Sequence, residues 1–363
     1  MRTALCSAVL VTAIGFAPTR LHSQAADAAD AAITAKIAEV NQRLQAVPDA
    51  QGLREACAGN LAAAGRAAAA HRTYVALGAL RRCLTYVGSL EVLAASQAGI
   101  GTDLAAFRKA WERAGVELHA RRAALGDAPG TRMPLAVRGM IESELLTFET
   151  YYQSALLYGE NTTVESGLLY LGFPYGVLDF VSFAASLPLP APAPAPAIPD
   201  LGGAMFALDG ELLDFYKAQT TPEMRGALAG TNSLFKVVQD LHAARMTAGT
   251  FFEYLRTVES FTANRVRAVE PADAATLRAR LASGVPRAAD VDQTIAGYFV
   301  ERAAGLLSDA EPSVDQRRAA AVILDAVLPA YDRALRGEIP AASVPASASA
   351  TPVTVTLVRW PYT

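Results

Sequence analysis

Residues 57–83 read CAGNLAAAGRAAAAHRTYVALGALRRC, two alanine- and leucine-rich runs that meet at His71-Arg72-Thr73. Both compositions favour α-helix. If the stretch were one helix, the two cysteines would lie roughly 39 Å apart at about 1.5 Å per residue, too far for a disulfide. A turn near Ala70 would instead place Cys57 and Cys83 side by side on two antiparallel helices. We therefore predict a helical hairpin closed by a Cys57–Cys83 disulfide, with two buried free thiols as the alternative.

The first 25 residues predict the compartment in which such a disulfide would form. Arg2, an apolar run over residues 4–17 and the small-residue site Ser23-Gln24-Ala25 are typical of a cleavable secretory signal peptide. The apolar run is shorter than the roughly 20 residues of a membrane span. Cleavage near Ala25 would remove Cys6 and leave an even cysteine pair in an oxidising compartment. We expect a bacterial protein that is periplasmic or secreted.

The charge balance argues against a nucleic-acid partner. Cleavage after Ala25 would remove Arg2 and Arg20 and no acidic residue. The 32 basic residues of the full chain would become 30, against 35 acidic residues, for a formal charge of −5. Nucleic-acid binding is typically supported by a basic surface, which this balance does not favour.

The same helical pattern extends through the rest of the chain. Long alanine- and leucine-rich segments carry apolar residues at helical spacing, and alternating apolar runs are missing before the C-terminus. We predict an all-α fold of about 11 to 12 helices stacked as antiparallel hairpins, in a bundle or in an array resembling helical-repeat scaffolds. The expected helices are 27–46, 51–70, 73–97, 102–125, 133–160, 163–186, 203–219, 222–245, 248–268, 272–283, 288–308 and 313–336.

An alternating proline run divides the chain. Residues 187–196 read LPLPAPAPAP, which cannot be helical and favours extended polyproline II. The run is either a stiff spacer between two domains or a surface strap across one helical array. The expected organisation is a signal peptide (1–25), an N-terminal helical region (26–186), a Pro/Ala-rich linker (187–200), a C-terminal helical region (201–337) and a tail (338–363).

The tail ends in an alternating segment. Residues 353–360 read VTVTLVRW, the pattern of a β-strand, after a stretch rich in Pro, Ala and Ser. A single strand is not stable alone. It would dock into the helical body, pair with the sheet edge of an envelope protein, or remain without structure until a partner binds.

The region 142–183 carries the candidate binding residues. Glu142, Glu149, Gln153 and Glu160 are spaced by 7, 4 and 7 residues, which places them within roughly 20° of one line along a helix. Carboxylates among leucines need a partner or a raised pKa. The stripe therefore predicts a cation site, a general base, or carboxylates paired with arginines.

Aromatic side chains crowd the same region and could line an apolar pocket, although such clusters are also common in cores. A very apolar segment, 167–187, contains Pro174 and Asp179, which favour a buried helix over a membrane span. Asp179 would then need an arginine or tyrosine partner. The candidate aromatic ligands are Tyr170, Tyr175 and Phe180.

No catalytic motif and no local metal-ligand spacing is present, and we expect neither a metal nor a cofactor. The favoured hypothesis is an exported, non-enzymatic protein that binds a small apolar ligand or an envelope protein through residues 142–183. One alternative is a periplasmic enzyme that uses Glu142, Glu149 or Asp179 as acid or base. The other is a structural component of an envelope assembly.

Overall fold

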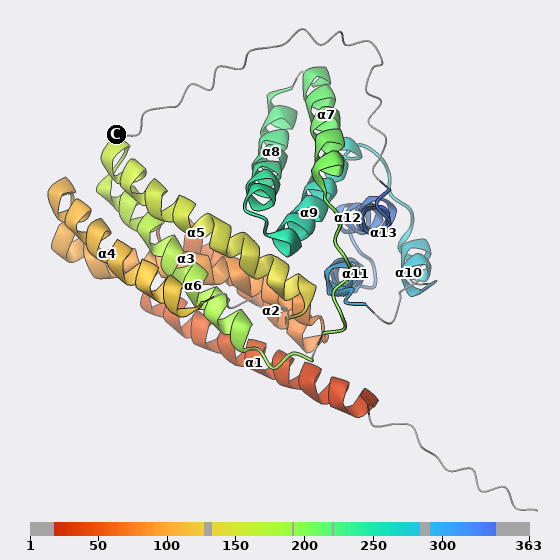
Figure 1. The fold of residues 1–363 in the computed structure, drawn as a ribbon, viewed down its shortest axis with the longest axis horizontal. Helices are drawn as coiled ribbons and strands as arrows, with labels where there is room; N and C mark the ends of the chain where they lie inside the picture. Colours follow the sequence, from red (N-terminus) through yellow and green to blue (C-terminus); the bar gives the residue numbers. More distant parts are fainter. Residues whose placement is uncertain (1–17, 127–132, 191, 220, 284–290, 339–363) are drawn as a thin grey trace, which may run out of the picture.

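The computed structural model describes residues 18–126, 133–190, 192–219, 221–283 and 291–338, and within them the chain is all-α with no strand (Figure 1). The expected helix order is present throughout these residues. The helices are α1 (Pro18–Ala46), α2 (Leu53–Ala69), α3 (Thr73–Ile100), α4 (Leu104–Ala124), α5 (Leu135–Asn161), α6 (Val164–Ser186), α7 (Gly202–Ala218), α8 (Pro222–Ala243), α9 (Thr247–Arg265), α10 (Ala274–Ser283), α11 (Thr294–Leu306), α12 (Val314–Val322), the π-helical turn η1 (Ile323–Val327) and α13 (Leu328–Leu335).

Side-chain caps fix where several helices begin. Asp103 accepts hydrogen bonds from the backbone N–H groups that open α4, and Thr221 does the same for α8. Ser313 and Gln316 form a reciprocal capping box at the start of α12. Caps of this kind satisfy backbone donors that have no partner within the helix.

The last helix changes its winding once. α12, η1 and α13 follow one another without a break, and the π-helical turn ends one residue before Leu328-Pro329. Pro329 has no N–H, and its ring would collide with the carbonyl four residues earlier in a regular helix. A wider turn just before the proline relieves that collision.

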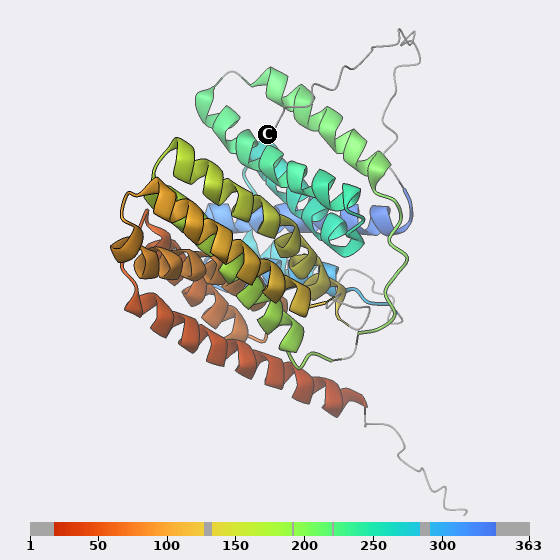
Figure 2. The same ribbon diagram turned by 60° about the vertical axis from the view of Figure 1, so that its left-hand side comes forward.

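The N-terminal helices surround a central pair, α3 and α6. α5 and α4 pack on α6, α2 packs on α3, and α1 crosses α2 and α3 at the outer edge (Figures 1 and 2). The α3–α6 contact is close because glycines meet there. A Cβ on Gly176 would lie 2.2 Å from the carbonyl oxygen of Leu84, and one on Gly172 would lie 2.3 Å from the Cα of Ser89.

The C-terminal helices build on α5. α9 packs along α5 and pairs with α8, α11 contacts both α3 and α5, and α7 lies at the opposite edge of the molecule from α1 (Figure 2). One continuous cluster of buried hydrophobic residues includes members of every helix from α1 to α13 except α10. The hydrophobic core is therefore continuous between α1–α6 and the later helices, and α9 and α11 make the contacts that join the two sets.

The proline run lies against this body. The carbonyl oxygen of Pro194 accepts a hydrogen bond of 2.8 Å from the backbone N–H of Asp292, and Leu187 and Leu201 at its two ends are buried. The segment connects α6 to α7 as an extended chain (Figure 1). The segment thus contacts the helical body at Pro194 and at both of its ends, and we refer to it as the strap.

Two expectations concern residues outside the described ranges. The apolar signal segment at 4–17 and the strand at 353–360 both lie there. α1 begins at Pro18, nine residues before the expected start, and its backbone runs through the expected cleavage position at Ala25. Cleavage there would leave a shorter α1 that still includes its buried residues Ile33 and Val40.

α6 is the one described helix whose length and composition would suit a membrane span. In the structure most of its apolar window is buried between α3, α4 and α5. Pro174 lies within it and Asp179 is paired with two arginines. These contacts are those of a central core helix.

Candidate functional site

Glu142 joins two helices in the interior. Its side chain accepts a hydrogen bond of 2.6 Å from Arg138 Nε and one of 2.7 Å from the backbone N–H of Gly249, in the first turn of α9. A carboxylate at a helix N-terminus satisfies a free N–H and interacts favourably with the helix dipole. Glu142 therefore anchors α9 on α5.

The other three members of the acidic stripe lie at the surface beside α4. Glu149 accepts hydrogen bonds from His119 and from Gln153, at 3.1 and 2.7 Å. Glu160 pairs with Arg108 at 2.7 Å. The stripe is therefore divided between a buried anchor and exposed contacts to the neighbouring helix.

The candidate aromatic residues pack mainly on one another. Tyr170 stacks on Tyr158 with ring centroids 4.1 Å apart, and Phe180 is fully buried. The Tyr175 hydroxyl donates to Glu117 at 3.1 Å. Burial, followed by the nearby Glu117 carboxylate, raises the pKa of Tyr175 to about 12.

Asp179 has the arginine partners expected of a buried acid, at 2.9 Å from Arg43 and 3.1 Å from Arg121. None of the four cavities that we describe is lined by residues 142–183. The structure thus brings these candidates together as contacts between helices.

A cavity with four arginines lies where the N-terminal and C-terminal helices meet. Its volume is about 260 Å³, and its wall comes from α2, α3, α5, α9 and α11. The lining residues are Asn60, Ala63, Val75, Gly78, Ala79, Arg81, Arg82, Met140, Phe252, Arg256, Tyr298 and Arg302. We refer to this site as the arginine cavity.

Helical spacing places the arginines in this wall. On three helices the arginine follows another lining residue by four positions, which is one turn on the same face. The pairs are Gly78 and Arg82 on α3, Phe252 and Arg256 on α9, and Tyr298 and Arg302 on α11.

Three buried carboxylates, those of Glu144, Glu253 and Glu259, pair with three of the arginines. Arg81 contacts Glu144 and Glu253, and Arg256 lies 2.7 Å from Glu253. Burial would raise the pKa of Glu253, but Arg256 and Arg81 outweigh it and hold that pKa below its usual value. Buried charges are stable only with such partners.

Arg302 is held less completely. Its Nε lies 3.0 Å from Glu259 Oε1, within ion-pair range, but makes no hydrogen bond. Burial lowers its pKa, and Glu259 together with Tyr298 more than compensates, so the pKa is raised overall. The Nε–H of Arg302 therefore lacks a hydrogen-bond acceptor.

Arg82 has no carboxylate partner. Within the described part of the chain its side chain makes no ion pair and no hydrogen bond, and the residue is exposed to solvent. Partial burial, followed by the positive charges of Arg256 and Arg81, lowers the pKa of Arg82. Four guanidinium groups therefore face three carboxylates, and the excess positive charge is at Arg82.

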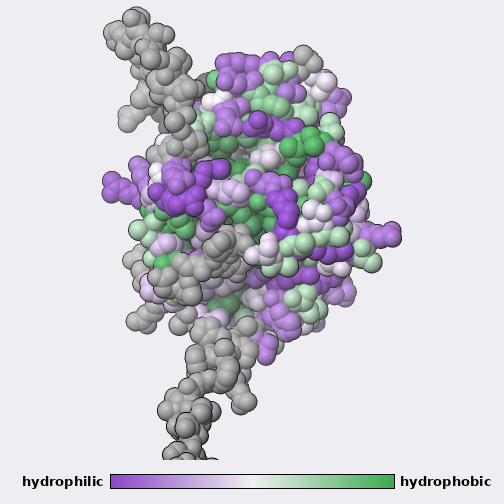
Figure 3. All heavy atoms as spheres, turned by 90° about the vertical axis from the view of Figure 1, so that its right-hand side faces the viewer, coloured by the Kyte–Doolittle hydropathy of each residue, from purple (hydrophilic) through white to green (hydrophobic). Residues whose placement is uncertain are grey.

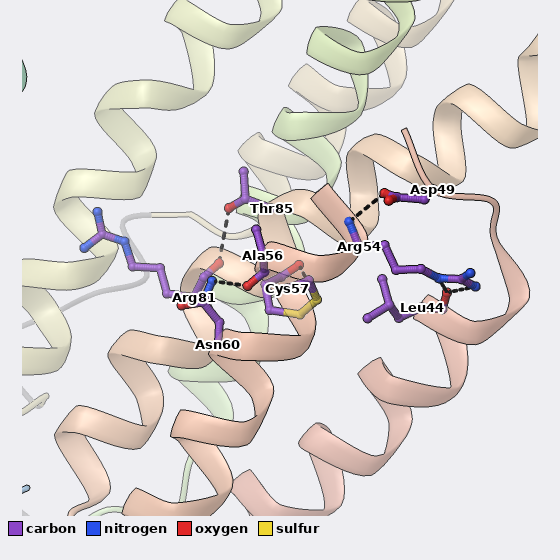
Figure 4. The surroundings of a disulfide bond; sticks show 9 residues. Leu44, Asp49, Arg54, Ala56, Cys57, Asn60, Arg81 and Thr85 are labelled. Atoms are coloured by element: carbon purple, nitrogen blue, oxygen red, sulfur yellow. Dashed lines mark hydrogen bonds between the residues drawn. A yellow bond between two sulfur atoms is a disulfide. The ribbon is translucent and has the colours of Figure 1, made fainter. Parts of the chain in front are cut away.

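The disulfide braces this wall. Cys57 and Cys83 are linked as expected, with Cα atoms 4.5 Å apart, between α2 and α3 (Figure 4). Cys83 directly follows Arg82, and Cys57 lies one turn before Asn60. The Arg81 side chain extends away from the disulfide toward the cavity side of α3 (Figure 4).

The arginine cavity could not be found from the sequence, because its lining residues are far apart in the chain and arginines are common throughout it. The available signal was the Arg81-Arg82 pair on a helix with alanine, glycine and leucine around it. Among the described residues, no group of three His, Cys, Asp or Glu side chains is arranged to hold a metal ion.

Comparisons with protein-family models, curated proteins and solved structures give no match. The function therefore has to be inferred from the residues and geometry of this chain.

Proposed function

We propose that the protein binds a small oxyanion, a molecule bearing a phosphate or carboxylate group, in the arginine cavity. The observation that carries the proposal is Arg82, a guanidinium in the cavity wall that has no carboxylate partner and lies beside two other guanidinium groups. An oxyanion would supply the missing negative charge. Guanidinium groups bind phosphate and carboxylate through two parallel hydrogen bonds, which also gives directional selectivity.

The size and the rest of the wall suit a small ligand. Ligand pockets usually begin at about 300 Å³, so a cavity of about 260 Å³ is at the lower limit. Met140, Phe252 and Tyr298 provide apolar surface beside the arginines. A compact anion with a short apolar part would match both the arginines and the apolar surface of the cavity.

The carboxylates of the site support binding over acid–base catalysis. Glu144, Glu253 and Glu259 are each paired with an arginine. Among the sequence-based candidates for an acid or base, Glu142 and Asp179 are likewise paired with arginines, and Glu149 accepts hydrogen bonds from His119 and Gln153. A general base needs a free lone pair within reach of its substrate.

Calorimetric titration of the disulfide-bonded protein with inorganic phosphate, pyrophosphate and citrate tests the proposal, with sodium chloride at matched ionic strength as reference. We expect saturable binding of at least one oxyanion at one site. Arg82→Gln should weaken it by about 10- to 100-fold, because a hydrogen bond to a charged group contributes roughly 1.5–3 kcal/mol. Arg82→Lys should retain part of the affinity.

Arg113→Gln is the matched control, since Arg113 is exposed on α4, which does not line the cavity. It should leave the affinity unchanged. Equal loss in both variants, or no binding beyond that of chloride, would show that the cavity does not select an oxyanion.

We further propose that the protein is exported and that residues 353–360 act as a strand that docks on this body or on an envelope partner. Residues 1–25 and the disulfide support export. The consecutive packed pairs α2–α3, α5–α6 and α8–α9 are compatible with a hairpin array. Intact-mass measurement of protein expressed with its full N-terminus should show loss of the first 25 residues, and an unprocessed mass would contradict export by this route.

A further inference from the structure

A second set of cavities lies beneath α7, away from the arginine cavity. One of about 210 Å³ is enclosed by the end of the strap, α7, α9 and α13, and one of about 180 Å³ continues along α7. The two share Ala204, Tyr254, Ala330 and Arg333 in their walls. A third, of about 340 Å³, adjoins the first at Pro199, Asp200 and Leu201. Together they form one groove, the α7 groove.

The α7 groove and the arginine cavity use opposite faces of α9. Phe252 and Arg256 line the arginine cavity, whereas Tyr254 and Val258 line the α7 groove. Residues two positions apart on a helix differ in direction by about 200°. The two sites therefore lie on either side of one helix, and occupation of one leaves the other open.

The floor and roof of the α7 groove are apolar. Leu208 from α7, Phe261 from α9 and Ala330 from α13 are buried there. Each cavity alone is below or near the size of a ligand pocket, but adjoining cavities reach the usual range above about 300 Å³. The shape is elongated along α7, which suits a chain-like apolar ligand.

The carboxylates in the walls of the groove have partners: Asp200 lies 3.5 Å from His242, Glu211 pairs with Arg265, and Glu338 pairs with Arg336. The Arg333 side chain lines both cavities beneath α7 and is exposed, and within the described part of the chain it makes no hydrogen bond and no ion pair. Arg245, at the far end of the groove, also lacks a side-chain partner among the described residues. Both unpaired charges are positive, so the complementary end of a ligand is anionic.

α7 packs on few neighbouring helices. It contacts α8 and α9, and three of the eight exposed large hydrophobic side chains in the described residues belong to it: Phe206, Leu213 and Tyr216. Hydrophobic atoms are also exposed between hydrophilic residues on the face that carries the C-terminal helices (Figure 3). A helix that is apolar on two sides and held by few neighbours can be displaced by an apolar ligand.

From these observations we infer that the α7 groove binds a single-chain amphiphile with an anionic head, of the long-chain carboxylate class. The acyl chain lies beneath α7 between Leu208 and Ala330, and the carboxylate pairs with Arg333. This inference is independent of the oxyanion proposed for the arginine cavity.

Displacement of the fluorescent fatty acid cis-parinaric acid from the full-length disulfide-bonded protein tests the inference. We expect saturable binding of one probe, with palmitate competing at least about tenfold better than hexadecanol, which has the same chain and no charge. Arg333→Gln should remove that preference, and because Arg333 is exposed this variant should fold normally. Ala330→Phe should block the path of the ligand's acyl chain, because Ala330 lines both cavities where they join.

Two control variants locate the binding at the α7 groove. Arg82→Gln and Arg113→Gln should bind the probe as the original protein does. Lack of saturable binding, or an Arg333→Gln variant that still prefers palmitate, would overturn the inference. A concentration-dependent dimer that excludes the probe would also overturn it, since the groove would then be an interface between two copies.

Discussion

Arg81 and Arg82 are neighbours in sequence with opposite electrostatic situations. Arg81 is paired with two buried carboxylates, whereas Arg82 is exposed and has no carboxylate partner, with Arg256 and Arg81 nearby. Neighbouring like charges repel one another, and an anion bound between them relieves that repulsion. The contrast can be measured without knowing the ligand.

Arg82→Met should change the free energy of unfolding by less than about 0.5 kcal/mol, because Arg82 is exposed and has no ion pair to lose. Arg81→Met should lower it by about 3–5 kcal/mol, since Glu144 and Glu253 lose a partner. Urea denaturation in ligand-free buffer measures both. If Arg82→Met were as destabilising as Arg81→Met, Arg82 would be a structural residue.

Glu301 should make the stability depend on pH. Its carboxylate accepts hydrogen bonds from the backbone N–H groups of Tyr74 and Val75 at 3.0 and 3.1 Å, yet burial outweighs them and raises its pKa to about 7. The folded protein therefore binds more protons than the unfolded chain between about pH 4.5 and pH 7, so this group's contribution to stability falls as pH rises through that window.

Glu301→Gln should abolish that part of the pH dependence and stabilise the protein above pH 7, by on the order of 3 kcal/mol at most. Glu311→Gln, at an exposed position before α12, should retain the original profile. Urea denaturation between pH 4 and pH 8 gives the comparison. A Glu301→Gln profile parallel to the original would mean that Glu301 does not titrate in this range.

At the scale of helices, α3 and α6 owe their closeness to glycine. In Gly176→Ala the new Cβ would meet the backbone of Leu84 and Thr85, which cannot move aside as a flexible side chain can. We expect a loss of about 1–3 kcal/mol in the free energy of unfolding from overpacking.

Gly230→Ala on α8 is the control, because its Cβ would have no neighbour within 4 Å. It should stabilise the protein by about 0.5–1 kcal/mol through helix propensity. Urea denaturation of the two variants should give opposite signs. The same sign in both would show that the α3–α6 contact is not limited by backbone approach.

The disulfide should matter for the arginine cavity as well as for stability. Cys57→Ser/Cys83→Ser should lower the free energy of unfolding by about 3 kcal/mol for a loop of this length. Because Cys83 directly follows Arg82, we also expect weaker oxyanion binding in the folded double variant. Calorimetric titration below the unfolding transition tests this, and unchanged affinity would show that α2 and α3 hold the wall without the cross-link.

The helices and the disulfide were accessible from sequence because they depend on local composition and on the separation of two cysteines. The helix order and the turn near Ala70 follow from such local rules. The arginine cavity does not, since Arg82, Arg256 and Arg302 meet only when three distant helices pack. Spacing placed Glu142 and Glu149 on one line but could not show that the first would be buried and the second exposed.

At the scale of the molecule, the first six helices and the later ones share their interior. The arginine cavity takes residues from α2, α3 and α5 and from α9 and α11, and one buried hydrophobic cluster continues through both sets. A ligand in that cavity would stabilise both sets together, by RT ln(1 + [L]/Kd), or about 2.7 kcal/mol at 100 times Kd.

Glu142 offers the sharpest test of this coupling, because it joins α5 to the first turn of α9. We expect the original protein to unfold in one calorimetric transition, and Glu142→Ala to lower that whole transition by about 2–3 kcal/mol, as Arg138 and the Gly249 N–H lose their partner. Glu149→Ala, on the same helix and the same line but exposed, should change it by less than about 0.5 kcal/mol. Two separate transitions, with only one of them moved by Glu142→Ala, would instead show that the parts of the chain on either side of the proline strap unfold independently.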